Sequence, residues 1–347
     1  MKKSKCIVLT LILIVIILAS VSFGSADITI ADTFRIIGNR LPFVNRLPFI
    51  GKLFDVSDIK DNYRMIILNV RLPRILLAAL VGGALSIVGA NFQGVFRNPL
   101  ADPHILGVSS GAAVGATIAI IIAETTGFAT NLLGLGTVGV FAFVGALLTV
   151  FAVYNIAKFA GEISTFSMLL TGTATSTFLS AIISLIMTFN KKKIEKVYMW
   201  TLGSFSAANW QKVLFMVFFD VVGVTILCLL ARKLNILMLG EDDAKCLGID
   251  TDKLRKIIIV SASVLVAAAV SVSGVIGFVG LIIPHCVRLI DGADNRRLIP
   301  TSFLIGASFM VVCDTIARTV AAPTEIPVGI ITALCGAPFF IWLVWKR

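Results

Sequence analysis

The sequence contains few charged residues and almost no histidine. Charged side chains make up 14% of its 347 residues and hydrophobic ones 58%, and histidine occurs twice. Soluble domains contain about one quarter charged residues and about one half apolar residues. The composition therefore excludes an ordinary soluble protein, and it is typical of a chain that crosses a membrane several times.

Several kinds of functional sequence are also missing. The six cysteines occur singly, without a CxxC pair or a histidine at zinc-ligand spacing, so we expect neither disulfides nor a metal site. No GxxxxGK[ST] loop is present, so any ATP hydrolysis belongs to another subunit. His104 and His285 each follow a proline and have no second ligand at helical spacing, which argues against an intramembrane hydrolase. We therefore expect that the chain is not an enzyme and that it holds no cofactor.

Long apolar runs, in contrast, are abundant. A bilayer core of about 30 Å requires about 20 mostly apolar residues per helix, and the sequence offers about ten such segments. We therefore predict an all-α, polytopic membrane protein with one transmembrane domain over residues 1–347. The predicted spans are 6–23, 74–96, 105–123, 132–154, 166–189, 213–230, 254–277, 278–290, 298–321 and 328–345.

The first segment permits two interpretations. Lys2, Lys3 and Lys5 precede an apolar run and the small-residue stretch SVSFGSA, which also describes a secretory signal peptide. The run is longer than most signal-peptide cores, so a retained span is preferred. Residues 24–70 are then predicted to be an extracytoplasmic loop, which includes the near-repeat NRLPFVNRLPFIGK at 39–52.

Small residues and hydroxyl groups mark two of the spans. The second span has a small residue every four positions, which permits close helix packing in lipid: Gly82, Ser86, Ala90 and Gly94. The first half of the fifth span is rich in hydroxyl groups: Thr171, Thr173, Thr175 and Ser176. Such hydroxyls often bond back to their own helix, so plain packing is one interpretation. The other is a polar, uncharged lining for a transport pathway.

Two carboxylates lie deep in predicted spans, where an ionisable group is a functional candidate by default. Arg318 follows Asp314 by four residues, in the favourable order for a helical ion pair, so a structural pair is preferred there. Asp220 has no partner that the sequence identifies. In a proton-coupled transporter, which remains an alternative, either carboxylate would titrate.

The polar stretch 231–253 is predicted to be a cytoplasmic loop that contains a short helix, Glu241 to Leu247. Its first residues are acidic, which suits a helix amino terminus. Gly248 suits the C-cap of this short helix by its position, and Asp250 suits the N-cap of the next helix.

Five stretches resemble the FecCD family, the membrane permeases of ABC importers for ferric siderophores, haem and cobalamin. They are RLPR (71–74), FRNPLADPHILGVSSGA (96–112), LGEDDAKCLGI (239–249), SGVIGFVGLIIPHCVRLI (273–290) and EIPVGIITALCGAPFFIWL (325–343). They occur in the family's order over nearly the whole chain from Arg71. The resemblance implies the permease subunit of an ATP-driven importer, with an iron chelate as the first expected cargo and cobalamin or haem as the alternative.

The resemblance also implies roles for particular residues. The cytoplasmic gate would comprise Asn98, Pro99, Leu100, Ser164 and Thr165. The coupling element, which rests on the ATPase, would comprise Glu241, Asp242, Asp243, Ala244, Leu247 and Gly248. The residues that meet an extracytoplasmic binding protein would be Arg71, Arg74 and Arg318. His104 falls at a variable position of the motif and is assigned no chemistry.

The same resemblance implies the assembly and its location. We expect a homodimer in the plasma membrane of a prokaryote, with two ATP-binding subunits inside and one substrate-binding protein outside. ATP and Mg would be bound by the ATPase subunits, and no nucleic acid is expected as a partner.

Overall fold

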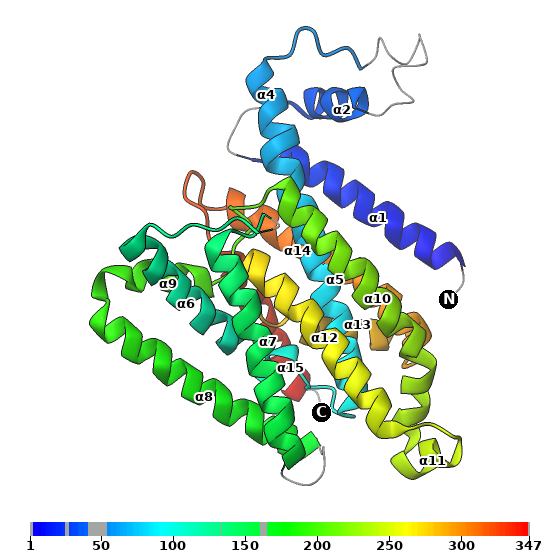
Figure 1. The fold of residues 1–347 in the computed structure, drawn as a ribbon. Helices are drawn as coiled ribbons and strands as arrows, with labels where there is room; N and C mark the ends of the chain where they lie inside the picture. The colour runs from blue at the N-terminus through cyan, green and yellow to red at the C-terminus, as the bar shows by residue number, and fades with distance from the viewer. Residues whose placement is uncertain (1–2, 25–27, 41–53, 133, 160–164, 346–347) are drawn as a thin grey trace.

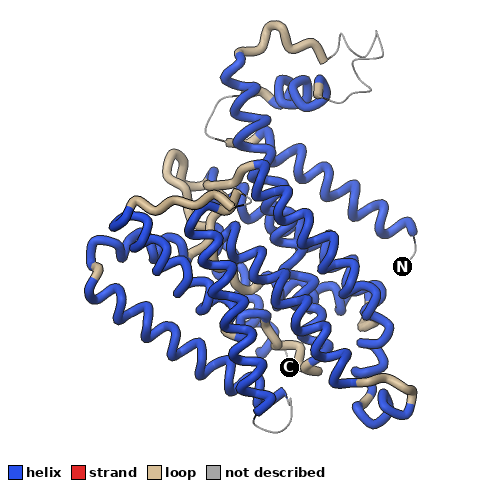
Figure 2. The backbone as a smooth tube through the Cα atoms, viewed as in Figure 1, coloured by secondary structure: helices blue, strands red, loops and turns tan. Residues whose placement is uncertain are grey.

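The computed structural model describes residues 3–24, 28–40, 54–132, 134–159 and 165–345, and the regular structure within these ranges is helical (Figures 1 and 2). The long helices are α1 (Lys3–Ser22), α5 (Leu72–Val95), α6 (Val108–Thr126), α7 (Gly136–Phe159), α8 (Thr165–Phe189), α10 (Trp210–Leu239), α12 (Thr251–Ser273) and α14 (Asn295–Thr319). The shorter elements are α2 (Ile30–Asn39), α4 (Asp61–Met65), α9 (Ile194–Thr201), α11 (Glu241–Cys246), α13 (Val279–Asp291), α15 (Val328–Trp345), the π-helical η1 (Ile66–Arg71), and the 3-10 turns η2 (Pro103–Leu106) and η3 (Lys191–Lys193).

Each predicted span corresponds to one helix, and the all-α membrane fold is confirmed. Eight of the described helices are long and apolar enough to cross a bilayer. The other two predicted spans are α13, which has 13 residues, and the apolar stretch Val328–Leu343 of α15. Both of these shorter helices contain a proline, Pro284 in α13 and Pro338 in α15.

The second span begins earlier than the sequence predicted. The helix runs without interruption over Asp61–Val95, 35 residues, or about 50 Å at 1.5 Å per residue. The π-helical turn explains why Pro73 does not stop it: the Leu72 N–H donates to the carbonyl of Ile67, five residues back, and the wider turn accommodates the proline ring. The predicted loop 24–70 is therefore partly helical, since it contains α2, α4 and η1.

Helix α5 is the centre of the bundle. It packs against α14, α10, α13 and α12, and nearly all of its residues are buried. A Cβ atom on Gly82 would collide with the carbonyl oxygen of Gly306, and one on Gly306 would collide with Ser86. Gly82 and Ser86 of the predicted stripe therefore bring the backbones of α5 and α14 together, whereas Gly94 of the stripe packs against Leu234 of α10. Such close approach is expected where lipid provides no hydrophobic drive for helix association.

Helices α1 and α8 lie at the edge of the bundle (Figure 1). α1 packs mainly on α14 and leaves Ile7, Leu11 and Val15 exposed by 58%, 56% and 64%. α8 packs on α6, α7 and η2 and exposes most of its length, including Phe166, Phe178 and Phe189. Apolar surface of this extent requires lipid or another chain to cover it.

The carboxyl-terminal end of α1 is attached to α14 by polar contacts. The hydroxyl oxygens of Ser20 and Thr315 lie 2.6 Å apart, and Arg318 Nη2 donates to the Ser20 carbonyl at 2.5 Å. These contacts join α1 to α14, and whether α1 is retained as a span stays a prediction.

Candidate functional site

The polar stretch after α5 forms a tight turn. Arg97 has a φ of +47°, a left-handed conformation that is uncommon for a long side chain. The Asn98 N–H donates to the Gln93 carbonyl at 3.2 Å, and the Asn98 Oδ1 accepts from the Leu100 N–H at 2.9 Å. Helix α5 ends at Val95, and Pro99, which has no N–H, prevents the helix from resuming in this turn.

Asp102 and His104 fix the next turn, η2. The Asp102 Oδ1 accepts from the His104 N–H at 2.7 Å. His104 Nε2 lies 2.9 Å from the Ile276 carbonyl oxygen, and its Nδ1 contacts the Ser109 hydroxyl. His104 is therefore a fully bonded polar residue. Among the described residues, no group of three or more His, Cys, Asp or Glu side chains could hold a metal ion.

The predicted gate residues come from this turn and from the start of α8. Leu100 is 50% exposed, whereas Asn98 and Pro99 are half-buried. Thr165 is the first residue of α8, and Ser164 lies outside the described residues. The two segments meet through η2, since a Cβ atom on Gly172 of α8 would collide with the carbonyl oxygen of Ile105. Their function as a gate remains a prediction.

Arg97 connects the turn to the end of α10. Its Nη2 donates to the Leu237 carbonyl oxygen at 2.7 Å. The last four carbonyls of a helix have no partner within that helix, so a cation is favoured at this position. Sequence reasoning missed this contact, although Arg97 lies inside the motif FRNPLADP, because its partner is 140 residues away.

Helix α11 follows directly, and it matches the predicted short helix. It spans Glu241–Cys246, with Leu247 as its C-cap. Gly248 has a φ of +76°, the left-handed conformation expected after a helix end. The Asp250 Oδ1 then accepts from the Lys253 N–H at 2.9 Å, which confirms Asp250 as the N-cap of α12.

The side chains of α11 divide into an attached face and an exposed face. Glu241 forms an ion pair with Arg255 of α12, and this hydrogen bond lowers the pKa of the Glu241 carboxyl. Ala244 is fully buried, whereas Leu247 is 63% exposed and Asp242 and Asp243 are also exposed. Figure 1 places α11 at the end of the bundle opposite to α2 and α4. Its exposed face thus carries two acidic residues, Lys245 and the apolar Leu247.

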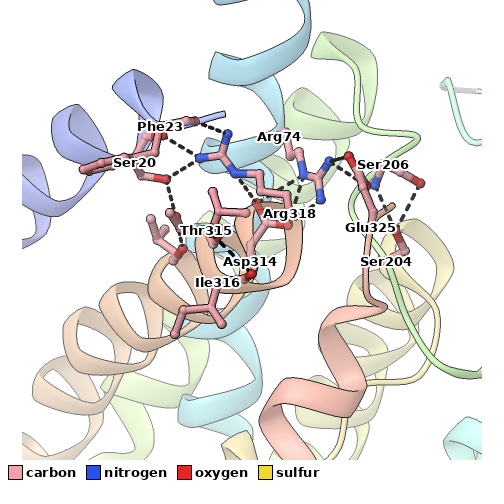
Figure 3. A network of polar contacts seen from close by, with 12 residues as sticks. Ser20, Phe23, Arg74, Ser204, Ser206, Asp314, Thr315, Ile316, Arg318 and Glu325 are labelled. Atoms are coloured by element: carbon pink, nitrogen blue, oxygen red, sulfur yellow. Dashed lines mark hydrogen bonds and ion pairs between the residues drawn. The ribbon is translucent and has the colours of Figure 1, made fainter. Parts of the chain in front are cut away.

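A layer of buried arginines lies at the other end of the bundle (Figure 3). Arg74 on α5 contacts the Asp314 carboxylate at 2.9 to 3.1 Å through Nε and Nη2. Its Nη1 donates to both oxygens of Glu325, at 2.8 and 3.0 Å. The Arg318 Nε lies 3.6 Å from Asp314. The helical pair predicted from sequence is therefore the weaker contact, because Arg74 from a neighbouring helix binds Asp314 more closely.

The other two arginines bind the end of α1. Arg318 donates to the carbonyls of Ser20 and Phe23, and Arg71 Nη1 donates to the Val21 carbonyl at 3.0 Å. Arg71, Arg74 and Arg318 are only 5%, 8% and 7% exposed. In this structure all three guanidinium groups serve internal contacts, and their predicted role in docking a binding protein remains a prediction.

The hydroxyl groups predicted to line a pathway occupy different faces of α8. Thr171 and Thr175 line a groove of about 610 Å³ between α7 and α8. Ser176 is half-buried near η2, whereas Thr173 is exposed and donates to the Leu169 carbonyl at 2.9 Å. Back-bonding of this kind satisfies a hydroxyl in an apolar environment. The four residues therefore do not form one continuous line.

Asp220 remains a buried carboxylate without a counter-charge. It is 4% exposed, and neither of its carboxylate oxygens has a hydrogen-bond partner within the part of the chain that the structure describes. The structure thus agrees with the sequence in assigning it no partner.

The comparisons with known proteins agree with this geometry. A model of the FecCD transport family matches residues 12–346. An ABC transporter permease protein from Bacillus subtilis is 41% identical over 336 residues, which cover 96% of this chain and 91% of that protein. A cobalamin import system permease protein from Halobacterium salinarum is 45% identical over 291 residues, which cover 83% of this chain and 76% of that protein.

A solved structure gives the same result for the fold. It shows an inward-facing conformation of a metal-chelate type ABC transporter, with a TM-score of 0.81, 35% identity and 99% coverage of both chains. Sequence motifs, helix arrangement and whole-length similarity all lead to one conclusion: the chain belongs to the FecCD transport family.

Proposed function

We propose that this chain is the membrane-spanning permease subunit of an ATP-driven importer that brings a ferric siderophore or a related iron chelate into a prokaryotic cell. The observation that carries the proposal is the similarity over 99% of both chains to a transporter of the metal-chelate type. A second candidate cargo is cobalamin, because a relative with 45% identity is a cobalamin import permease.

In this proposal α11 is the contact with the ATP-binding subunit. Its exposed residues Asp242, Asp243 and Leu247 would meet that subunit, while buried Ala244 and the Glu241–Arg255 pair attach α11 to α12. A shift of α11 would also move the end of α10, to which Arg97 is bonded. The turn at Asn98 would follow, so ATP binding could favour one of two rigid arrangements of the gate.

The uncovered helix α8 is the proposed contact with a second copy of the chain. Its groove with α7 and its exposed Thr173 give this side a mixed apolar and hydroxyl surface. A pathway between two such surfaces would pass a bulky solute without binding it tightly, because it presents no charge. ATP and Mg would be bound by two ATPase subunits, and one soluble binding protein would deliver cargo at the opposite end.

Uptake into proteoliposomes tests this function. The vesicles would contain this chain and its ATP-binding subunit, with the binding protein outside, and would receive either a labelled ferric siderophore or labelled cobalamin. We expect uptake of the siderophore only with ATP on the α11 side. Uptake of cobalamin alone would select the second cargo, and uptake of neither in the presence of ATP would contradict the proposal.

A further inference from the structure

The short helix α2 is strongly amphipathic. Thr29 is its N-cap and accepts a hydrogen bond from the Asp32 N–H at 3.1 Å. At 100° per residue, Ile30, Phe34 and Ile37 share one side of the helix, whereas Asp32 and Arg35 lie on the other. An isolated helix of ten residues is marginal in water, so its apolar side must be covered by something.

The described residues cover a different side of α2, which lies between its apolar side and its polar side. Thr33 and Ile36 are 1% and 2% exposed where α2 packs on α1 and η1. The polar side is held by Arg35, which donates to both oxygens of Asp58 at 2.6 and 3.0 Å. Asn39 Nδ2 donates to the Phe54 carbonyl at 3.0 Å. These contacts fix the rotation of α2 about its own axis.

With that rotation, the residues that the structure describes leave much of the apolar side uncovered. Ile30 is 58% exposed and Phe34 is 43% exposed. Apolar residues on the adjoining ends of α1, α4 and η1 are exposed as well: Phe23, Met65 and Val70, by 55%, 61% and 55%. Figure 1 shows α2 lying across the end of the bundle that is opposite to α11, beside the outer end of α1.

We propose that α2 lies in the headgroup region of the membrane leaflet opposite to α11, with Ile30 and Phe34 inserted among the acyl chains. α2 packs against α1, and α1 itself exposes Ile7, Leu11 and Val15, which require lipid around them. An amphipathic helix binds such an interface with its apolar side buried by about 5–10 Å.

A soluble protein fits this surface less well. Docking of an acidic partner would need a basic surface, but the described helix carries one acidic residue and one basic residue, Asp32 and Arg35. Arg35 is in addition already paired with Asp58. Lipid is therefore the occupant that the chemistry of this side favours, and the inference depends on the membrane location of the chain rather than on its cargo.

Fluorescence quenching in lipid nanodiscs tests the inference without any transport assay. Phe34→Trp places a reporter on the uncovered side, and Asp61→Trp is the matched control, because Asp61 at the start of α4 has an 89% exposed side chain. The signal of the parent chain, with its four native tryptophans, is subtracted. Lipids brominated near the headgroup report contact with the bilayer, and acrylamide reports contact with water.

We expect brominated lipid to remove at least half of the fluorescence added by Phe34→Trp, and acrylamide to quench it several-fold less than it quenches Asp61→Trp. Equal acrylamide quenching at both positions, without an effect of bromine, would place α2 in water and overturn the inference. A Phe34→Trp signal that changes only when the binding protein is added would overturn it in favour of a protein contact. Ile30→Trp provides the same readout if the first variant folds poorly.

Discussion

Arg74 on α5 and Asp314 on α14 form an ion pair that is shielded from solvent. The side chains are 9% and 1% exposed, and three nitrogen–oxygen distances lie between 2.9 and 3.1 Å. Glu325 adds a second carboxylate to Arg74 from the segment before α15. Arg74, Asp314 and Glu325 thus join α5, α14 and the segment before α15, which are far apart in sequence. These contacts stabilise that end of the bundle.

Replacing Arg74 by glutamine should strongly destabilise the protein. The change leaves the Asp314 charge buried without its closest partner, which typically costs about 3–5 kcal/mol. Glu325→Gln is the matched control, since its side chain is 44% exposed and loss of an exposed pair costs about 0–1 kcal/mol. Denaturant unfolding in detergent measures both. If Arg74→Gln unfolds like the parent and only the affinity for the binding protein falls, Arg74 is a docking residue instead.

This layer also illustrates how far the sequence could predict the site. The motifs located Arg71, Arg74 and Arg318 at one end of the spans, and the structure brings them together: Arg74 and Arg318 share Asp314, and Arg71 and Arg318 bind neighbouring carbonyls at the end of α1. Sequence spacing can identify only neighbours along one helix, so it paired Asp314 with Arg318. The closer partner, Arg74, lies 240 residues away and depends on the packing of α5 against α14.

Replacing Arg97 by glutamine should reduce transport per ATP hydrolysed. A hydrogen bond from a charged group contributes about 1.5–3 kcal/mol, and each 1.4 kcal/mol corresponds to about tenfold in an equilibrium. We therefore expect at least about a tenfold lower ratio of uptake to hydrolysis, with hydrolysis itself retained. Lys233→Gln, at an exposed position on α10, is the control. Equal losses of uptake and hydrolysis would indicate that Arg97 only supports folding.

The attachment of α11 should depend on pH through Glu241. Its pKa is lowered in the folded protein by the hydrogen bond from Arg255. The pair therefore contributes stability above the ordinary pKa of glutamate, and this contribution is lost as the pH falls through the lowered value. The Glu241 side chain is 42% exposed, so we expect an effect below about 1 kcal/mol.

The measurement is the difference in unfolding free energy between the parent and Glu241→Gln, from pH 7 down to a pH below the lowered pKa of Glu241. The parent should be the more stable protein near pH 7, and the difference should vanish in acid. A difference that is independent of pH would mean that the carboxylate charge is not responsible.

Helix α8 should meet its counterpart in a second copy. A single cysteine at the exposed position Thr173, in a variant without the six native cysteines, should form an intermolecular cross-link in membranes. Val15→Cys on α1, which is 64% exposed, is the control and should not cross-link, because lipid surrounds α1. The reverse pattern would assign the contact between copies to α1.

The fold was more predictable than the detailed contacts, for a physical reason. Membrane thickness sets the length of each apolar segment, so all ten predicted spans correspond to helices. The π-helical turn at Ile66–Arg71 left no such signal, and the sequence therefore predicted that the second span begins only at residue 74. The end of α11 and the start of α12 were predictable because Gly248 and Asp250 act locally.

The energy source of transport tests the central proposal most directly. Proteoliposomes with this chain, its ATP-binding subunit and the loaded binding protein would be given either ATP on the α11 side or a pH gradient without ATP. The parent and Asp220→Asn would be compared, since Asp220 is the buried carboxylate without a partner. We predict that both proteins take up cargo when ATP is supplied and that neither does so when only the pH gradient is supplied. Uptake that follows the pH gradient and disappears in Asp220→Asn would contradict an ATP-driven permease and identify a proton-coupled transporter.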